Sequence, residues 1–188
     1  MGHKEDLLAG AKKCLREKGY ANTTARDIVA ASGTNLASIG YHFGSKDALM
    51  TQAIVEMLGE WGEHFGAEPA ASIPDYGERF EKHWRDLAAA VASDRQLSLA
   101  SFENAATAMR IPELATIIAS GQEDARAGLG DDFAAPDADA ETKRAVGSLM
   151  LAVTTGVIAQ WLVDPERSPT PDDIVKAFHA IADAFGRK

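Results

Sequence analysis

The sequence predicts an all-α fold, and three observations lead to that prediction. Apolar residues recur at steps of three and four along most of the 188-residue chain, as they do on one face of a helix. No stretch shows the alternation of apolar and polar residues that marks a half-buried strand. Glycine and proline divide the helical patterns into about nine segments. We therefore expect about nine helices and no sheet.

The first two expected helices are separated by a short turn. The first covers about residues 4–18 and ends at Gly19. The second begins at TTARD, where Thr24 and Asp27 have the spacing of a capping box. It stops at Gly33, because glycine adopts positive φ at little cost.

The third expected helix, about residues 34–43, follows almost at once. At 100° per residue, its apolar residues fall within about 60° of one direction, so we expect them to anchor the helix on its neighbours. These anchor residues are Leu36, Ile39, Gly40 and Phe43. The opposite side carries small and hydrogen-bonding residues, namely Thr34, Ala37, Ser38, Tyr41 and His42, with Asn35 beside them. We expect that side to face outward.

The fourth expected helix starts at Ser45 or Lys46 and reaches about residue 66. Its apolar stripe has helical steps and comprises Met50, Ile54, Met57, Trp61 and Phe65. Pro69 and Pro74 end the pattern, since proline cannot continue a helix. Further helices are expected over about residues 75–93, 95–109, 112–128, 140–163 and 171–186, and GLGDDFAAPDADA is expected to be a loop.

The helix expected over residues 140–163 is apolar nearly all round. One stripe holds Val146, Leu149, Met150, Val153, Val157 and Trp161, and other apolar residues fall outside it. Such a helix must be covered on both sides, either by its own fold or by a second subunit. The final helix carries a seam of Ile174, Phe178, Ile181 and Phe185 that is suited to packing on such a partner.

The charge of the chain is unevenly distributed. The net charge is −9, but residues 1–50 contain seven Lys and Arg against five Asp and Glu. Residues 51–188 contain twelve against twenty-three. The asymmetry would turn the weakly basic N-terminal part toward a polyanion and keep the acidic remainder away from it.

The second and third helices have the spacing of a helix-turn-helix, in which the second helix protrudes. The major groove of B-DNA is wide enough to admit a helix, and Ala37 and Ser38 are small enough for close approach. Thr34, Asn35 and the Tyr41–His42 pair can hydrogen-bond to base edges or phosphates. The geometry therefore predicts contact with double-stranded DNA.

Two helix starts in this region could bind phosphate. The fourth helix begins after Gly44 and Ser45 with unpaired backbone N–H groups, and Lys46 adds a positive charge there. Thr24, at the start of the second helix, could present a second such site. Phosphate contacts would set the docking register while the third helix reads the sequence.

The segment TTARDIVAASGTNLASIGYHFGSKDAL resembles the DNA-binding segment of the tetracycline-repressor (TetR) family, bacterial regulators with an N-terminal three-helix domain and a helical C-terminal domain. The most specific part of the match is YHFGSKDAL. The resemblance implies DNA-facing positions for Thr24, Arg26, Tyr41, His42 and Lys46. It also implies a DNA-binding domain over residues 1–50 and an effector-binding and dimerisation domain over residues 51–188.

The same resemblance implies a homodimer in which the last two helices form a four-helix bundle. The interface would then include Val153, Val157, Ile174, Phe178 and Ile181. Three positions depart from the pattern of many members. Gly40 stands where many have a tyrosine, Val29 where an alanine is frequent and Thr34 where valine is usual. Tyr41, one position on, is then the substitute for a phosphate-binding tyrosine at position 40.

An effector cavity in the C-terminal domain is a further implication of the resemblance. Apolar walls with a few polar groups are typical of small-molecule pockets. The residues on the helices that surround the cavity in the family are His83, Trp84, Phe102, Glu103, Asn104, Met109, Met150 and Trp161. Aromatic residues and methionines at helical spacing are also typical of an ordinary core.

The sequence does not indicate an enzyme. It lacks the zinc-protease, nucleophile-elbow, phosphate-loop and dinucleotide-binding motifs. The histidines, His3, His42, His64, His83 and His179, share no metal-ligand spacing, and Cys14 is the single cysteine. We expect no cofactor and no metal.

The charged N-terminus and the absence of a run of 18 apolar residues favour a cytoplasmic protein without a membrane segment. The resulting hypothesis is a homodimeric transcriptional regulator, a repressor released from a palindromic operator by a small-molecule effector. Two alternatives lack DNA binding: a helical small-molecule-binding protein, and an adaptor acting through protein contacts. The adaptor would need an exposed apolar face on the N-terminal helix pair.

Overall fold

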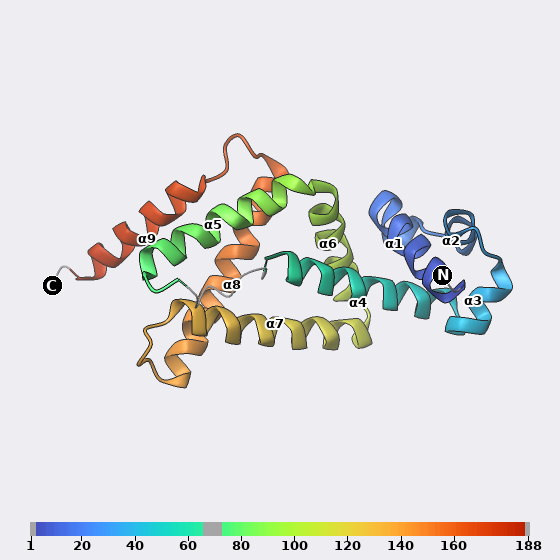
Figure 1. Cartoon of the computed structure of the whole chain (residues 1–188), viewed down its shortest axis with the longest axis horizontal. Helices are drawn as coiled ribbons and strands as arrows, with labels where there is room; N and C mark the ends of the chain where they lie inside the picture. The colour runs from blue at the N-terminus through green and yellow to red at the C-terminus, as the bar shows by residue number, and fades with distance from the viewer. Residues whose placement is uncertain (1–2, 66–72, 187–188) are drawn as a thin grey trace. The chain divides into compact units, whose positions relative to one another are not determined.

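The structure is a computed structural model that describes residues 3–65 and 73–186. Within these ranges every regular element is a helix (Figure 1). The helices are α1 (His3–Asn22), α2 (Ala25–Ser32), α3 (Leu36–Phe43), α4 (Lys46–Phe65), α5 (Tyr76–Ser93), α6 (Arg95–Ala108), α7 (Pro112–Phe133), α8 (Ala140–Val163) and α9 (Pro171–Gly186). The predicted all-α class is confirmed.

The chain forms two compact units. The first comprises residues 1–64 and 96–119, and the second comprises residues 65–95 and 120–188. The first unit thus contains the region predicted to bind DNA together with α4, nearly all of α6 and the start of α7. The predicted boundary at residue 50 separates a DNA-binding from an effector-binding domain by function rather than by packing. It stays a prediction.

The first unit is built around one hydrophobic core. Residues of α1, α2, α3, α4, α6 and α7 contribute to it, and most of them are almost inaccessible to solvent. They include Leu7, Ala11, Leu15, Ile28, Ile39, Leu49, Met50, Ile54, Met57, Leu97 and Leu114. Because Leu49 and Met50 lie in the same core as Leu7, the first turns of α4 are fixed to the helix-turn-helix.

The close packing of α1 on α2 depends on a glycine. A Cβ atom at Gly10 would lie 2.8 Å from Ser32 Cβ and 2.9 Å from the carbonyl oxygen of Ile28. Real Cβ atoms do not approach other heavy atoms so closely. Gly10 therefore allows α1 and α2 to pack backbone to backbone, which sets the position of the turn that follows α2.

Ion pairs join α1 to the middle of α4 within the first unit. Lys12 Nζ lies 3.1 Å from Glu56 Oε2 and 2.7 Å from Glu60 Oε1, and Arg16 Nη2 lies 3.2 Å from Glu60 Oε2. Hydrogen bonding to Glu60 raises the pKa of Lys12, although burial opposes it. These ion pairs add to the hydrophobic contacts that hold α4 against α1.

The second unit has its own core, in which α5 packs against α9 and α8 (Figure 1). Phe80 lies at the centre of an aromatic cluster, with ring centroids 5.0 Å from Phe178, 5.6 Å from Phe133 and 6.1 Å from Trp84. From α8, the core receives Met150, Val157, Ile158, Trp161 and Leu162, and from α9 it receives Ile174.

The helix α7 is longer than the sequence predicts, since it continues to Phe133 through residues that were expected to form a loop. The glycine at position 130 does not end the helix. A Cβ atom there would overlap the carbonyl oxygen of Lys143, and one at Gly147 would overlap that of Arg126. These glycines permit α7 and α8 to pack closely.

Among the described helices, α8 alone is long and apolar enough to span a bilayer by length and composition. Its 18-residue window has a mean hydropathy of 1.7, and a third of that window is buried within the chain. The core helix of a soluble protein meets the same criterion. The property therefore assigns no membrane, but it does show that α8 exposes apolar surface.

Candidate nucleic-acid interface

The backbone of the helix-turn-helix is fixed by two side-chain caps and a glycine. Thr24 caps α2 by accepting a hydrogen bond from the N–H of Asp27, whose carboxylate accepts the N–H of Thr24 in return. Gly33 ends α2 in the left-handed conformation, with φ 68°. Asn35 then caps α3. The predicted capping box and turn are present, and three residues separate the end of α2 from the start of α3.

The anchor of α3 differs from the prediction. Ile39 is buried and Phe43 packs against the same core, but Leu36 is 52% exposed and Gly40 is exposed as well. The pair at positions 39 and 43 sets the inward direction, which is rotated by roughly 30° from the predicted one. The expectation that Leu36 is buried is therefore wrong.

This rotation changes which residues face outward. Tyr41 is 85% exposed and Ala37 is exposed, whereas Ser38 and His42 are half-buried. The rings of Tyr41 and His42 meet edge to face with centroids 4.8 Å apart. The outward surface of α3 thus consists of Leu36, Ala37, Gly40 and Tyr41, and it is less polar than the sequence indicated.

Three residues that were predicted to face DNA already form side-chain hydrogen bonds within the helix-turn-helix. They are Thr34, Asn35 and Ser38. Asn35 Oδ1 accepts hydrogen bonds from the Ser38 N–H at 3.0 Å and from Ser38 Oγ at 3.2 Å. Thr34 Oγ1 lies 2.8 Å from Ser32 Oγ. These side chains shape the start of α3, and a DNA contact from Asn35 would use its amide NH₂ group.

At the start of α2, Thr24 is exposed, but its N–H and its hydroxyl both bond to Asp27. Lys18 Nζ lies 2.5 Å from Asp27 Oδ1, and hydrogen bonding by Lys18 and then by Thr24 holds the pKa of Asp27 far below its usual value. The carboxylate therefore stays ionised and neutralises Lys18. Arg26 is exposed, and no described residue pairs with it, so it is the cation here that is available to a phosphate.

Lys46 is less free than the sequence suggested. Its Nζ donates to the carbonyl oxygen of Thr23 at 3.2 Å and lies 5.7 Å from the centroid of the Tyr20 ring. Ser45 Oγ accepts a hydrogen bond from the N–H of Ala48 and so caps α4. The ammonium group thus ties the start of α4 to the turn after α1, and a phosphate would compete for it.

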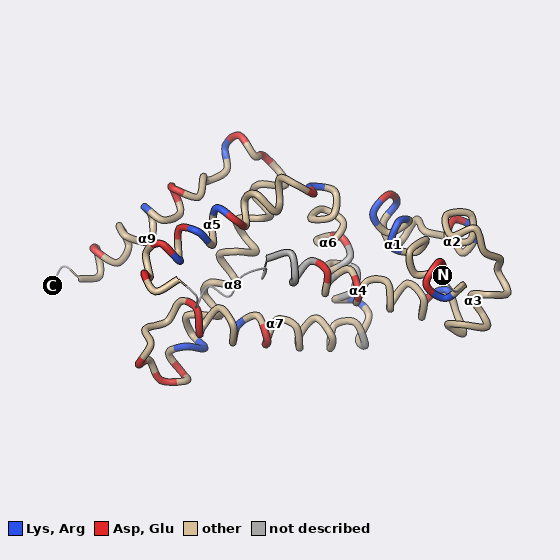
Figure 2. Tube along the Cα trace, in the orientation of Figure 1, with Lys and Arg blue, Asp and Glu red and all other residues tan. Residues whose placement is uncertain are grey.

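The charge distribution suits a helix that approaches bases rather than one that binds phosphate. Figure 2 shows that α3 carries no Lys, Arg, Asp or Glu, whereas basic positions lie along α1. Lys and Arg contacts to phosphate supply most non-specific affinity for DNA, and base edges are read by hydrogen bonds and apolar contacts. Because α3 carries no Lys or Arg, it suits the reading of base edges, and its exposed Tyr41 hydroxyl is a group that can also hydrogen-bond to a phosphate.

The residues predicted to line an effector cavity are distributed over both units. In the first unit, Phe102 is half-buried, Glu103 is exposed and Met109 is 69% exposed, while the side chain of Asn104 lies outside the described residues. In the second unit, Trp84 and Met150 are buried and Trp161 donates its indole N–H to the carbonyl oxygen of Pro169. The predicted cavity stays untested.

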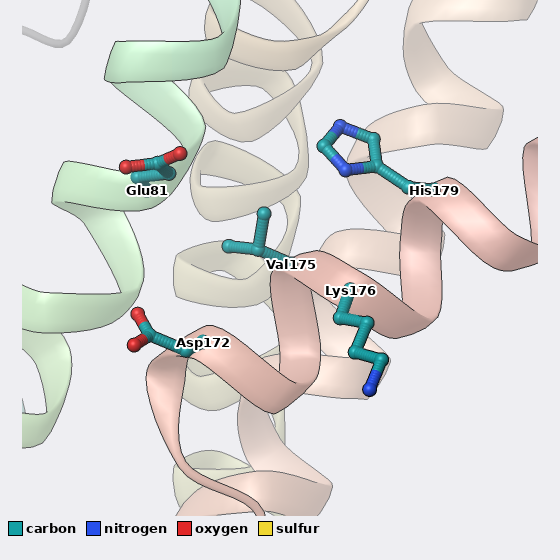
Figure 3. A pocket seen from close by; sticks show the side chains of 5 residues that line it. All are labelled: Glu81, Asp172, Val175, Lys176 and His179. Atoms are coloured by element: carbon teal, nitrogen blue, oxygen red, sulfur yellow. The ribbon is translucent and has the colours of Figure 1, made fainter.

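A surface groove of about 310 Å³ occurs at a different place in the second unit. It lies between α5 and α9, and Figure 3 shows the side chains that line it: Glu81, Asp172, Val175, Lys176 and His179. None of the predicted effector residues is among them. No motif in the sequence marks this groove.

His83 and Trp84 carry buried polar atoms for which the described part of the chain supplies no hydrogen-bond partner. His83 Nε2 and Trp84 Nε1 are buried, and no described residue bonds to either atom. The rings of His83 and Phe133 lie with centroids 5.0 Å apart. Burial lowers the pKa of His83 to about 4, because protonation would place a charge in this apolar surrounding.

We expect His83 to make folding stability depend on pH. Since the pKa is about 6.5 in the unfolded chain and about 4 in the folded one, stability is lost as the pH falls through this window. Urea unfolding of wild type and His83→Phe should show that wild type loses about 2 kcal/mol more than the variant between pH 7 and pH 4.5. Equal losses in the two proteins would contradict a His83 imidazole that is neutral in the folded state.

Comparison with protein families matches two segments of the chain. Residues 7–53 match the model of bacterial regulatory proteins of the tetR family. Residues 77–184 match the tetracyclin repressor-like C-terminal domain. The two matches cover the helix-turn-helix with the start of α4 and almost all of α5 to α9.

Curated relatives match parts of the chain. The HTH-type transcriptional repressor AcnR of Corynebacterium efficiens is 37% identical over 46 residues, which is 24% of each protein. The HTH-type transcriptional dual regulator CecR of Shigella flexneri is 30% identical over 109 residues, or 53% of this chain and 48% of CecR. The matches thus span a quarter to a half of the relatives' length.

Solved structures resemble the whole chain. The putative transcriptional regulator SCO7518 of Streptomyces coelicolor A3(2) has a TM-score of 0.76 at 17% identity, with 95% of this chain and 97% of that one covered. The multidrug binding protein EbrR, complexed with imidazole, has a TM-score of 0.74 at 24% identity, with 94% and 87% covered. These likenesses establish the fold, and the match to residues 77–184 covers more than half of the sequence. The chain belongs to the TetR family of bacterial regulatory proteins.

Proposed function

We propose that this protein is a homodimeric transcriptional regulator that represses by binding a palindromic operator and is released by a small-molecule effector. The observation that carries the proposal is α3, a helix fixed by buried Ile39 whose Ala37 and Tyr41 protrude into solvent. A protruding helix with small residues fits the major groove. AcnR, which is 37% identical to this chain over 46 residues, is itself a repressor.

An exposed apolar surface on the last two helices supports a dimer. On α8, Leu149 is 57% exposed and Val163 84% exposed, with Ala152 and Gly156 on the same side. On α9, Ile181 is 54% exposed and Phe185 81% exposed. Surface of this kind is rare on a monomer, whereas a second copy of the chain would cover it.

The structure revises which residues would form that interface. Val157 and Ile174 are buried in the core of their own chain, and Phe178 contacts Phe80. Val153 is half-buried and Ile181 is exposed, so they remain available to a partner. We assign the interface to the exposed sides of α8 and α9 rather than to the predicted stripe as a whole.

An effector in the second unit would meet aromatic rings and two unpaired polar atoms. His83 Nε2 and Trp84 Nε1 are buried without partners among the described residues, and a bound molecule could satisfy them. The fold relative EbrR has been crystallised with imidazole, ethidium and proflavin. We infer an organic effector for this chain. Coupling would require that the effector and the operator favour different conformations of α4.

Selection of random duplex DNA by the purified protein tests the proposal. We expect an inverted repeat whose half-sites lie about 34–36 Å apart, the distance between successive major grooves on one face of DNA. Affinity should fall steeply with salt, with a slope near −0.9 per phosphate contact. Selection of a single half-site would contradict the dimer, and recovery of unselected sequence would contradict DNA recognition. The adaptor alternative, which the exposed Leu36 partly favours, predicts the latter result.

A further inference from the structure

Leu36 is an exposed leucine at the start of α3. More than half of its surface is accessible, although the preceding turn and Ile39 fix the helix firmly. A single exposed leucine is ordinary on a protein surface. This one, however, lies with the exposed Ala37 and Gly40 on the helix that carries the proposed DNA contact.

The polar means of reading bases are few on this surface. Guanine is read most often by Arg or Lys, and α3 contains neither. Adenine is read by an amide that uses both its oxygen and its NH₂ group. Asn35 is the amide that caps α3, and its oxygen already accepts two hydrogen bonds from Ser38. Bidentate reading of adenine would therefore uncap the helix.

Apart from the exposed hydroxyl of Tyr41, apolar contact is the way in which the outward surface of α3 can distinguish base pairs. Thymine alone among the four bases carries a methyl group in the major groove, and apolar side chains recognise it. Leu36 offers exposed methyl groups at the helix end that enters the groove first in a helix-turn-helix. Ala37, next to it, leaves room for a base to approach.

We propose that Leu36 is a specificity-determining residue that contacts the 5-methyl group of a thymine in each operator half-site. The proposal rests on the proposed function, because it requires that α3 enters the major groove. It goes further in naming both the base and the chemical group that the protein selects.

Replacement of single thymines by deoxyuridine tests this directly, since it removes the methyl group and leaves base pairing intact. The probe is the duplex selected by the wild-type protein, substituted at one thymine at a time, symmetrically in both half-sites. At one position, we expect affinity to fall about fourfold per contacted methyl and so about fifteenfold for the dimer. A scan with no sensitive thymine overturns the inference even though the protein binds DNA.

Leu36→Ala shows whether this residue makes the contact. At the sensitive position, the ratio of affinities for thymine and deoxyuridine should fall to about one in the variant. Leu99→Ala, which truncates a leucine that is 41% exposed on α6, should keep the wild-type ratio. An unchanged ratio in Leu36→Ala overturns the inference, and so does an equal loss of affinity for both duplexes. If the wild-type protein selects no sequence at all, the proposed function fails first and the inference with it.

Discussion

Replacing Gly147 with alanine is expected to destabilise the second unit by about 3 kcal/mol. A Cβ atom at this position would overlap the carbonyl oxygen of Arg126 and lie 2.9 Å from the N atom of Gly130. Both neighbours belong to the backbone of α7 and cannot rotate away, so the two helices would have to separate. Overpacking of a close-packed interior has a cost of this size. Urea unfolding followed by circular dichroism measures it.

Gly128→Ala is the matched control on α7. Apart from the adjacent backbone of α7 itself, no described heavy atom lies within 4 Å of the position that its Cβ would occupy. The substitution therefore changes the conformational freedom of the backbone without creating a clash. Alanine is favoured over glycine inside a helix by about 0.5–1 kcal/mol, and this variant should be slightly stabilised. If Gly147→Ala were as stable as Gly128→Ala, the close packing of α7 on α8 would be refuted.

The local signals in the sequence predicted the helix-turn-helix well. The capping box of Thr24 and Asp27, the turn at Gly33 and the start of α4 at Lys46 are all as expected. Each depends on residues within four positions of one another. Caps and tight turns are determined by such short-range chemistry, and no knowledge of the tertiary fold is required.

The wrong predictions concern features that depend on contacts between residues far apart in the sequence. Because α3 has only about two turns, its periodicity defines the inward direction to no better than tens of degrees. Packing against α1 and α4 buries Ile39 and leaves Leu36 exposed. The segment from Gly128 resembled a loop, but Gly130 within it lies in α7 and leaves room for the backbone of Lys143. The carbonyl oxygen that binds Lys46 belongs to Thr23, 23 residues away. None of these contacts leaves a periodic signal.

The sequence also could not divide the apolar surface of α8 and α9 between the core and a partner. Val157 and Ile181 carry equally apolar side chains in the predicted stripes, yet the first is 6% exposed and the second 54% exposed. Periodicity locates an apolar stripe but not the element that covers it. Packing against α5 determines which apolar residues of α8 and α9 are buried in the chain's own core.

Ala37→Glu is expected to have the largest effect on function. Ala37 is exposed in the first turn of α3, where a glutamate favours the helix, so the fold should be unchanged. In the proposed complex, the carboxylate would face the polyanion at close range in both half-sites. Like charges brought together in an interface cost several kcal/mol, and we expect operator affinity to fall at least about a hundredfold.

The control is Ala127→Glu, which makes the same change of charge at an exposed position of α7. It should leave affinity within about twofold of wild type, because a lone exposed charge outside the interface is largely screened. Circular dichroism and sedimentation should show the same helix content and the same oligomer for both variants.

The measurement that tests the central claim most directly is therefore fluorescence anisotropy of the selected operator duplex titrated with wild type, Ala37→Glu and Ala127→Glu. If the outward side of α3 reads DNA, binding should be lost in Ala37→Glu alone. If Ala37→Glu bound the duplex as tightly as wild type, α3 would not lie in the groove and the proposed mode of recognition would be wrong.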